Sequence, residues 1–229
     1  MIIYGRNPVR EALRGRRRVH RVWATARAAR EPWLPGGASV EIVGSEEIEA
    51  RAGTGAHQGM CAEVPAFPYV GEEELLARTD PLLVALDGIE DPQNLGAICR
   101  SAECAGVDGV VIPERRAAEV TPAVCKAAAG AVEHLRIARV RNIADFLAAA
   151  RRRGCWSYGA AAGAPRSYRE VDWRGGAVLV IGGEGRGLRP RVAGVCDELV
   201  SIPLRGTLDS LNASSAAAVL LYAALDARA

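Results

Sequence analysis

The hydrophobic positions from residue 82 onward alternate between short apolar runs and longer periodic segments. The continuous run Leu82 to Asp87 predicts a buried strand, because a strand covered on both faces is apolar on both. The same reasoning predicts strands at 110–112, 135–138, 155–160, 178–181 and 199–204, and helices at 94–105, 122–129 and 143–152. Strands and helices that alternate along a chain predict an α/β fold whose parallel sheet has helices on both faces.

The first 64 residues follow a shorter pattern. We predict an amphipathic helix over residues 3–14, strands at 19–25, 40–43 and 59–64, and a helix entry that Ser45 can cap. Residues 65–80 contain Pro65, Pro68 and Gly71 and are the predicted linker. We therefore expect a small α/β domain at 1–64 and a larger domain at 81–229.

Two segments near the end of the chain carry the strongest local signal. The strand at 178–181 runs into four glycines within six residues, around the carboxylate of Glu184, and glycine lets bare backbone approach a ligand. The last segment is polar at 210–215 and then almost wholly apolar, which predicts a helix buried on all sides. Two loops that meet over the start of a buried helix predict a small-molecule site.

Positive charge is concentrated at the N-terminus. The net charge is only +2, yet residues 1–30 hold nine arginines against one acid, Glu11. Such a patch is typical of a surface that binds phosphate backbones. The arginines we expect to contact nucleic acid are Arg6, Arg10, Arg16, Arg17 and Arg18. The alternative, a GC-rich genome that writes arginine on solvated faces, explains the single lysine, Lys126, but not the missing acids.

Composition excludes several classes of protein. No apolar run reaches the length of a membrane span, and the first residues lack the basic-then-apolar order of a secretory signal. The six cysteines lie singly without a CxxC pair, and the three histidines are widely spaced, so no metal site is predicted. We expect a cytoplasmic protein with reduced cysteines.

The glycine loop has one rival interpretation, a dinucleotide-binding fingerprint. That fingerprint needs glycine or alanine at position 188, where Leu188 stands, and an acid about 20 residues later, which is missing. A phosphate loop is excluded as well, since no Gly-Lys-Ser/Thr follows. Nicotinamide-dependent oxidoreduction is therefore not supported.

Arg100 is the first upstream candidate for chemistry. Leu95 and Ile98 belong to one apolar stripe of the predicted helix, and Arg100 points the opposite way. A solvated arginine is the simplest interpretation. Small residues border it at Gly96 and Cys104, which a free solvent face does not need, and this favours a functional role.

Three motifs together resemble the signature motifs of the SpoU (TrmH-type) RNA 2′-O-ribose methyltransferases. They are Asn94-x-Gly96-x-x-x-Arg100, Gly182-x-Glu184-x-x-Gly187, and Ile202-Pro203-Leu204 followed by Ser210-Leu211-Asn212. Their order, spacing and place at strand ends all fit, and the similarity extends into the first domain at residues 3–13 and 57–59. Within the family, the chain is most similar to bacterial enzymes that methylate a guanosine ribose in large-subunit ribosomal RNA.

The resemblance implies a parallel-sheet methyltransferase domain with a C-terminal trefoil knot, preceded by an L30e-like α/β domain that binds RNA. It also implies S-adenosylmethionine as methyl donor, ribosomal RNA as substrate and a homodimer packed through the knotted domains. The positions that match the family's cofactor-binding residues are Gly182, Gly183, Gly187, Ile202, Leu204 and Leu211. The positions that match its catalytic residues are Asn94, Arg100, Glu184, Ser210 and Asn212.

The roles of these side chains follow from their chemistry. Arginine is a poor base, because its guanidinium stays protonated. As a hypothesis, Arg100 holds the phosphate or ribose and stabilises the developing alkoxide, Asn94 orients it, and Glu184 organises the loop or a water. Two alternatives stay open from the sequence: a transfer RNA substrate, and a non-catalytic RNA-binding assembly factor on the same scaffold.

Overall fold

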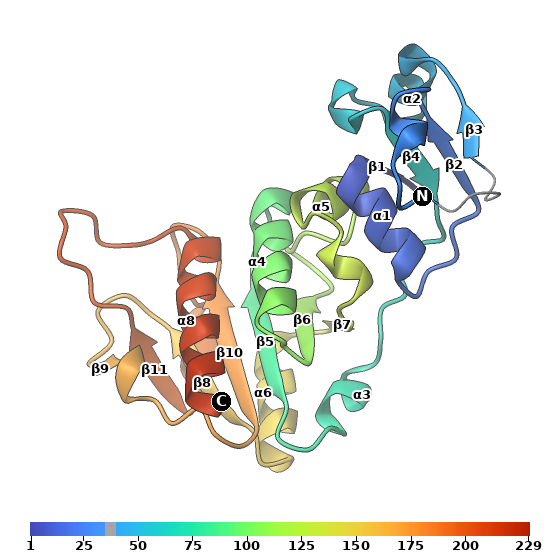
Figure 1. Ribbon diagram of the computed structural model, residues 1–229. Helices are drawn as coiled ribbons and strands as arrows, with labels where there is room; N and C mark the ends of the chain where they lie inside the picture. The colour runs from blue at the N-terminus through green and yellow to red at the C-terminus, as the bar shows by residue number, and fades with distance from the viewer. Residues whose placement is uncertain (35–39) are drawn as a thin grey trace.

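The computed structural model describes residues 1–34 and 40–229 and contains two sheets (Figure 1). The smaller sheet is built from β1 (Ile2–Tyr4), β2 (Arg21–Ala24), β3 (Val40–Ile42) and β4 (Met60–Glu63). The larger sheet is built from β5 (Leu82–Asp87), β6 (Gly109–Pro113), β7 (Ile137–Val140), β8 (Trp156–Ala160), β9 (Arg166–Ser167), β10 (Ala177–Gly182) and β11 (Glu198–Ser201). The helices are α1 (Arg6–Arg14), α2 (Ser45–Ala52), α3 (Glu72–Leu76), α4 (Pro92–Cys104), α5 (Pro122–Ala127), α6 (Ile143–Arg152), α7 (Pro190–Ala193) and α8 (Ala213–Arg228).

The larger sheet has the strand order β7-β6-β5-β10-β8-β11-β9, and every registered pair in it is parallel. Successive side chains of a strand face opposite sides. Val84 therefore packs in the core shared with α4, α5 and α8, and Leu83 in the core shared with α3, α6 and α7. This arrangement confirms the predicted α/β fold with helices on both faces of a parallel sheet.

The position of β10 brings distant parts of the sequence together. It lies between β5 and β8, in a register that pairs Gly182 with Asp87. Both strands end at the same edge of the sheet, because they are parallel. The segment that follows Asp87 and the glycine loop that follows Gly182 therefore leave the sheet side by side.

Two predictions about local structure are wrong. Residues 2–4 form strand β1 rather than the start of a helix, because Ile3 pairs antiparallel with Ala62 of β4. Helix α8 is not buried on all sides: Leu220 and Leu221 are fully buried, but Tyr222 is 46% exposed. The apolar sequence of α8 therefore exceeds what one chain covers.

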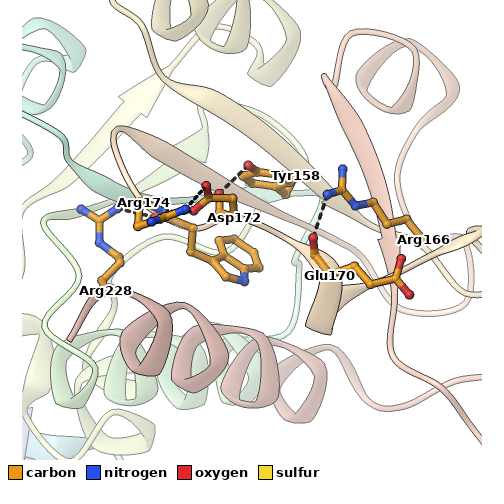
Figure 2. A network of polar contacts seen from close by, with 7 residues as sticks. Tyr158, Arg166, Glu170, Asp172, Arg174 and Arg228 are labelled. Carbon is orange, nitrogen blue, oxygen red and sulfur yellow. Dashed lines mark hydrogen bonds and ion pairs between the residues drawn. The ribbon is translucent and has the colours of Figure 1, made fainter.

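A polar network fixes the C-terminal end of α8 to the segment that leads into β10 (Figure 2). Arg228 Nη1 donates to the carbonyl oxygen of Trp173 at 2.8 Å, and Tyr158 Oη donates to the carbonyl oxygen of Asp172 at 2.8 Å. The indole of Trp173 is buried and lies 4.8 Å from the ring of Tyr158. These contacts hold the C-terminal end of α8 to the segment that leads into β10.

The first domain packs on α5 and on the short helix at Ala131–Glu133. Arg17 is central to this contact: its Nε donates to Glu133 Oε2 at 2.8 Å, its Nη2 also pairs with Glu133, and both side chains are almost completely buried. The prediction that Arg17 contacts nucleic acid is therefore wrong, because its guanidinium is enclosed in the protein.

The domain boundaries at residues 64 and 80 stay a prediction, as does the C-terminal trefoil knot.

Candidate active site

The glycine loop after β10 is a tight turn in which the backbone crosses itself closely. Gly187 N donates to Gly183 O at 3.0 Å, and Gly185 and Gly187 have φ of 73° and 62°, in the left-handed region that favours glycine. A Cβ on Gly182 would lie 2.1 Å from the carbonyl carbon of Gly187. Gly182 therefore has to be glycine for this loop to close.

A cavity of about 840 Å³ lies between the glycine loop and the segment that joins β11 to α8. Its volume is in the range of small-molecule sites, roughly 300–1,000 Å³. The structure brings all six positions predicted to bind cofactor to its lining, namely Gly182, Gly183, Gly187, Ile202, Leu204 and Leu211. Bare backbone on one side and aliphatic side chains on the other suit a ligand held mainly by main-chain hydrogen bonds and apolar contact.

Three candidate catalytic side chains, one from each motif, meet at the edge of this cavity. Asn94 Nδ2 donates to Glu184 Oε1. Asn212 Nδ2 donates to Asn94 Oδ1 at 3.0 Å and to Glu184 Oε1 at 3.2 Å. Residues separated by up to 118 positions thus form one hydrogen-bonded cluster. We call Asn94, Glu184 and Asn212 the Asn-Glu-Asn cluster.

Two helix starts place the two asparagines. Asp91 caps α4 by accepting from Gln93 N at 2.9 Å, with Pro92 in the first helical position, which is the arrangement expected where a helix begins. Asn212 caps α8: its Oδ1 accepts from Ser214 N at 2.8 Å and from Ser215 N at 3.3 Å. The amide oxygen of Asn212 thus starts the helix while its nitrogen binds the cluster.

The other two candidate catalytic residues lie apart from the cluster. Ser210 lines the cavity, is exposed, and donates from Oγ to Asp209 at 3.1 Å. Arg100 is exposed on α4, lines neither of the two cavities at the edge of the sheet, and has no ion pair among the described residues. Within one chain the structure therefore does not bring Arg100 to the glycine loop.

An ion pair between the buried carboxylate of Asp87 and the exposed Arg189, which sequence reasoning did not assign, supports the glycine loop. Asp87 accepts from Arg189 N at 2.8 Å and from Arg189 Nε at 2.6 Å, and is only 1% exposed. The signal was present in the sequence, because a carboxylate at the end of a buried strand needs a partner. The pair ties the end of β5 to the far side of the glycine loop.

Cysteine chemistry is not available near the site. Burial raises the pKa of the Cys99 thiol, on α4, to about 12. Burial, together with the charges of Asp197 and Asp87, raises the pKa of Cys196 to about 12. Both thiols are protonated at neutral pH, and a thiol in that state is a poor nucleophile.

The remaining predicted RNA-contacting arginines lie on the first domain. Arg16 and Arg18 are exposed and have no ion pair within the described ranges, whereas Arg6 pairs with Glu31 at 2.9 Å and Arg10 with Glu11 at 2.7 Å.

Residues 1–34 and 40–229 contain no group of three or more His, Cys, Asp or Glu side chains that could hold a metal ion. None of the helices formed by these residues combines the length and apolarity needed to cross a bilayer.

Comparison with known proteins agrees with this geometry. Residues 81–222 match the model of the SpoU rRNA Methylase family, and residues 2–70 match the substrate-binding model of RNA 2′-O ribose methyltransferases. YacO of Bacillus subtilis, a protein assigned to the TrmH family of tRNA/rRNA methyltransferases, is 36% identical over 96% of this chain and 93% of its own. The 23S rRNA (guanosine-2′-O-)-methyltransferase RlmB of Pseudomonas aeruginosa is 42% identical over 76% of this chain and 72% of its own.

Among solved structures, the SpoU methyltransferase AviRb of Streptomyces viridochromogenes, in complex with the cofactor AdoMet, matches with a TM-score of 0.83 and 26% identity. The match covers 99% of this chain and 89% of AviRb. The AdoMet-bound rRNA methyltransferase of Sinorhizobium meliloti matches with a TM-score of 0.81 and 26% identity, over 97% of this chain and 85% of that one. The chain therefore belongs to the SpoU rRNA methylase family, as its three motifs predicted, and with it to the S-adenosylmethionine-dependent RNA 2′-O-methyltransferases.

Proposed function

We propose that this protein transfers a methyl group from S-adenosylmethionine to the ribose 2′-OH of a guanosine in large-subunit ribosomal RNA. The observation that carries the proposal is the Asn-Glu-Asn cluster, which joins all three motifs at the edge of a cavity lined by glycine backbone. The choice of guanosine and of 23S rRNA is supported by the names of the relatives that are about 40% identical. On the same ground we propose a cytoplasmic location.

The residues of the larger cavity fit this methyl donor. Gly182 and Gly183 line the cavity, and neither has space for a Cβ, because the backbone of Gly187 packs against the first and that of Gly88 against the second. Ile202 and Leu211 add apolar surface for a purine ring, and the polar edge at Ser210 and Asn212 suits the hydroxyl and amino groups of the ligand. We assign the cavity to S-adenosylmethionine on these grounds.

When bound, the donor supplies an electrophilic methyl group on a sulfonium: an oxygen–carbon bond forms, the carbon–sulfur bond breaks, and sulfur leaves as a neutral thioether. The ribose hydroxyl loses its proton to solvent water in the same process, so that the products are the methyl ether, the thioether and a hydrated proton. Positioning supplies most of the acceleration for a displacement of this kind. Asn94 and Asn212 fix the carboxylate of Glu184, and the fixed Glu184 holds the loop between the two reactants.

We propose that Arg100 acts in the active site of a second copy of the chain. It lies on the exposed face of α4, and α4 packs beside α8, whose outer face exposes Val219, Tyr222 and Leu225. We propose that these apolar side chains are covered in a homodimer packed through the knotted domains. In that dimer Arg100 reaches the partner's RNA and binds its phosphate or ribose through a planar guanidinium.

The first domain is proposed to hold the RNA through Arg16 and Arg18, which have no ion pair among the described residues, and through Arg6 and Arg10 on the preceding helix α1. Phosphate contacts of this kind position RNA without reading its sequence. A transfer RNA substrate remains the alternative within the family, since the relatives include proteins assigned to both kinds of RNA.

Calorimetric titration of the full chain with S-adenosylmethionine tests the proposal against a non-catalytic assembly factor. We expect saturable binding of one donor per chain that is lost in Gly182→Ala. A chain that binds RNA but shows no heat with S-adenosylmethionine would favour the assembly factor and overturn the proposed activity.

A further inference from the structure

A second cavity, of about 530 Å³, lies next to the larger one at the same edge of the sheet. The two cavities border each other at Gly183, Glu184, Arg186 and Gly187, which line both. A group that accepts a methyl has to lie in direct contact with the donor, because the reacting atoms must come within roughly 3.5 Å of each other. The second cavity is a space that borders the larger one in this way.

The second cavity carries two guanidinium groups with no assigned partner. Arg116 follows β6 and Arg186 lies within the glycine loop, so they come from two different loops. Neither makes an ion pair or side-chain hydrogen bond to any residue that the structure describes, whereas Arg189 in the same lining is bound to Asp87. Asp91 and Glu184, which also line this cavity, are bound by amide and backbone N–H groups, and Glu90 has no ion pair among the described residues, so the two guanidinium groups stand beside carboxylates that do not neutralise them.

The backbone at Arg116 is held in an uncommon conformation. Its φ is +56°, in a region of backbone conformation that residues other than glycine rarely adopt. The loop is anchored on both sides of it, because Glu114 N donates to Val140 O at 2.9 Å and Ala118 N donates to Ile89 O at 2.8 Å. Backbone strain that the surroundings enforce is concentrated at ligand sites. Here it places Arg116 at the cavity.

We propose that this second cavity receives the target nucleotide and that Arg116 and Arg186 bind the phosphates on either side of it. The inference rests on the proposed function. A cavity of this size accommodates one nucleotide, and a base reaches such a pocket only when it leaves its stack. Two guanidinium groups from separate loops suit the two phosphates that flank an extruded nucleotide, since arginine binds phosphate with a planar pair of donors.

Arg116→Gln in the full chain tests this, with Arg115→Gln as the matched control: Arg115 is exposed, next in sequence, and lines neither cavity. We expect Arg116→Gln to raise the KM for an unmodified transcript of large-subunit ribosomal RNA by roughly tenfold or more, because a hydrogen bond to a charged group is lost. The KM for S-adenosylmethionine should not change. Arg116→Lys should recover part of the loss, because the charge remains.

A second readout does not depend on activity. In fluorescence anisotropy with labelled single-stranded RNA, the slope of log Kd against log salt should fall by about 0.7 in Arg116→Gln, the amount for one lost phosphate contact. Arg115→Gln should keep the wild-type slope and KM. Suppose that the wild type methylates RNA, and that Arg116→Gln and Arg115→Gln have the same salt slope and the same KM for RNA. The inference about Arg116 is then wrong and the proposed function stands. If the wild type binds RNA without methylating it, the proposed function fails and the slope alone decides the inference.

Discussion

At the scale of single residues, the amide of Asn212 has two separate tasks. Its oxygen caps α8, and its nitrogen binds Asn94 and Glu184. Asn212→Asp keeps the cap, since aspartate caps as well as asparagine, but places a second carboxylate beside Glu184. We expect Asn212→Asp to keep the cap contribution of about 1 kcal/mol and to lose about a hundredfold in kcat, the range for removing one oriented donor. Asn212→Ala should lose activity and also about 1 kcal/mol of stability. Equal stability of the two variants would contradict the double role.

Arg17 shows how much stability one buried charge pair controls. Arg17→Ala leaves the fully buried carboxylate of Glu133 without its partner, and removal of one member of such a pair costs about 3–5 kcal/mol. Denaturant unfolding should show this loss, while Arg16→Ala, at an exposed site, should stay within about 0.5 kcal/mol of the wild type. The double variant Arg17→Met, Glu133→Leu should recover most of it. A small effect of Arg17→Ala would mean that the first domain is not held at this contact.

At the scale of the elements, the glycine loop is the part with the least tolerance. In Gly182→Ala the new methyl group would overlap the backbone of Gly187 and Leu188. We expect a loss of about 1–3 kcal/mol in the free energy of unfolding, as for an overpacked site, together with loss of S-adenosylmethionine binding. Gly206→Ala is the control, since nothing lies within 4 Å of its Cβ position and its φ is not in the left-handed region. Equal behaviour of both variants would show that the loop can rearrange.

The sequence predicted the elements of the larger sheet well, because buried strands and amphipathic helices have distinct apolar patterns. It could not predict that β10 lies between β5 and β8, since strand order depends on contacts between distant segments. The burial of Arg17 was also hidden: in the run Arg16-Arg17-Arg18 only the pairing with Glu133, 116 residues away, distinguishes the middle residue. The Asn-Glu-Asn cluster was predicted as three motifs, but its hydrogen bonds required the fold.

At the scale of the whole molecule, the proposed dimer makes each active site depend on both chains. Arg100→Ala and Asn212→Asp should each be slower than the wild type by about a hundredfold, and mixing them under conditions that exchange subunits should restore about a quarter of the wild-type rate. Half of the mixed dimers are heterodimers, and each of these has one site with both residues intact. Methyl transfer by the remixed sample, with sedimentation to measure the dimer, checks this. No recovery from a confirmed heterodimer would place Arg100 in the site of its own chain.

The most direct test of the central claim is the position of the methyl group in RNA. The full chain, S-adenosylmethionine and an unmodified transcript of large-subunit ribosomal RNA are incubated together, and the RNA is then mapped by mass spectrometry and by resistance to alkaline cleavage. We expect one guanosine methylated on its ribose 2′-oxygen, with Glu184→Gln slower by about a hundredfold. A methyl group on a base, or an RNA left unmodified by a chain that binds both reactants, would contradict the assignment of these two cavities to a methyl donor and a ribose.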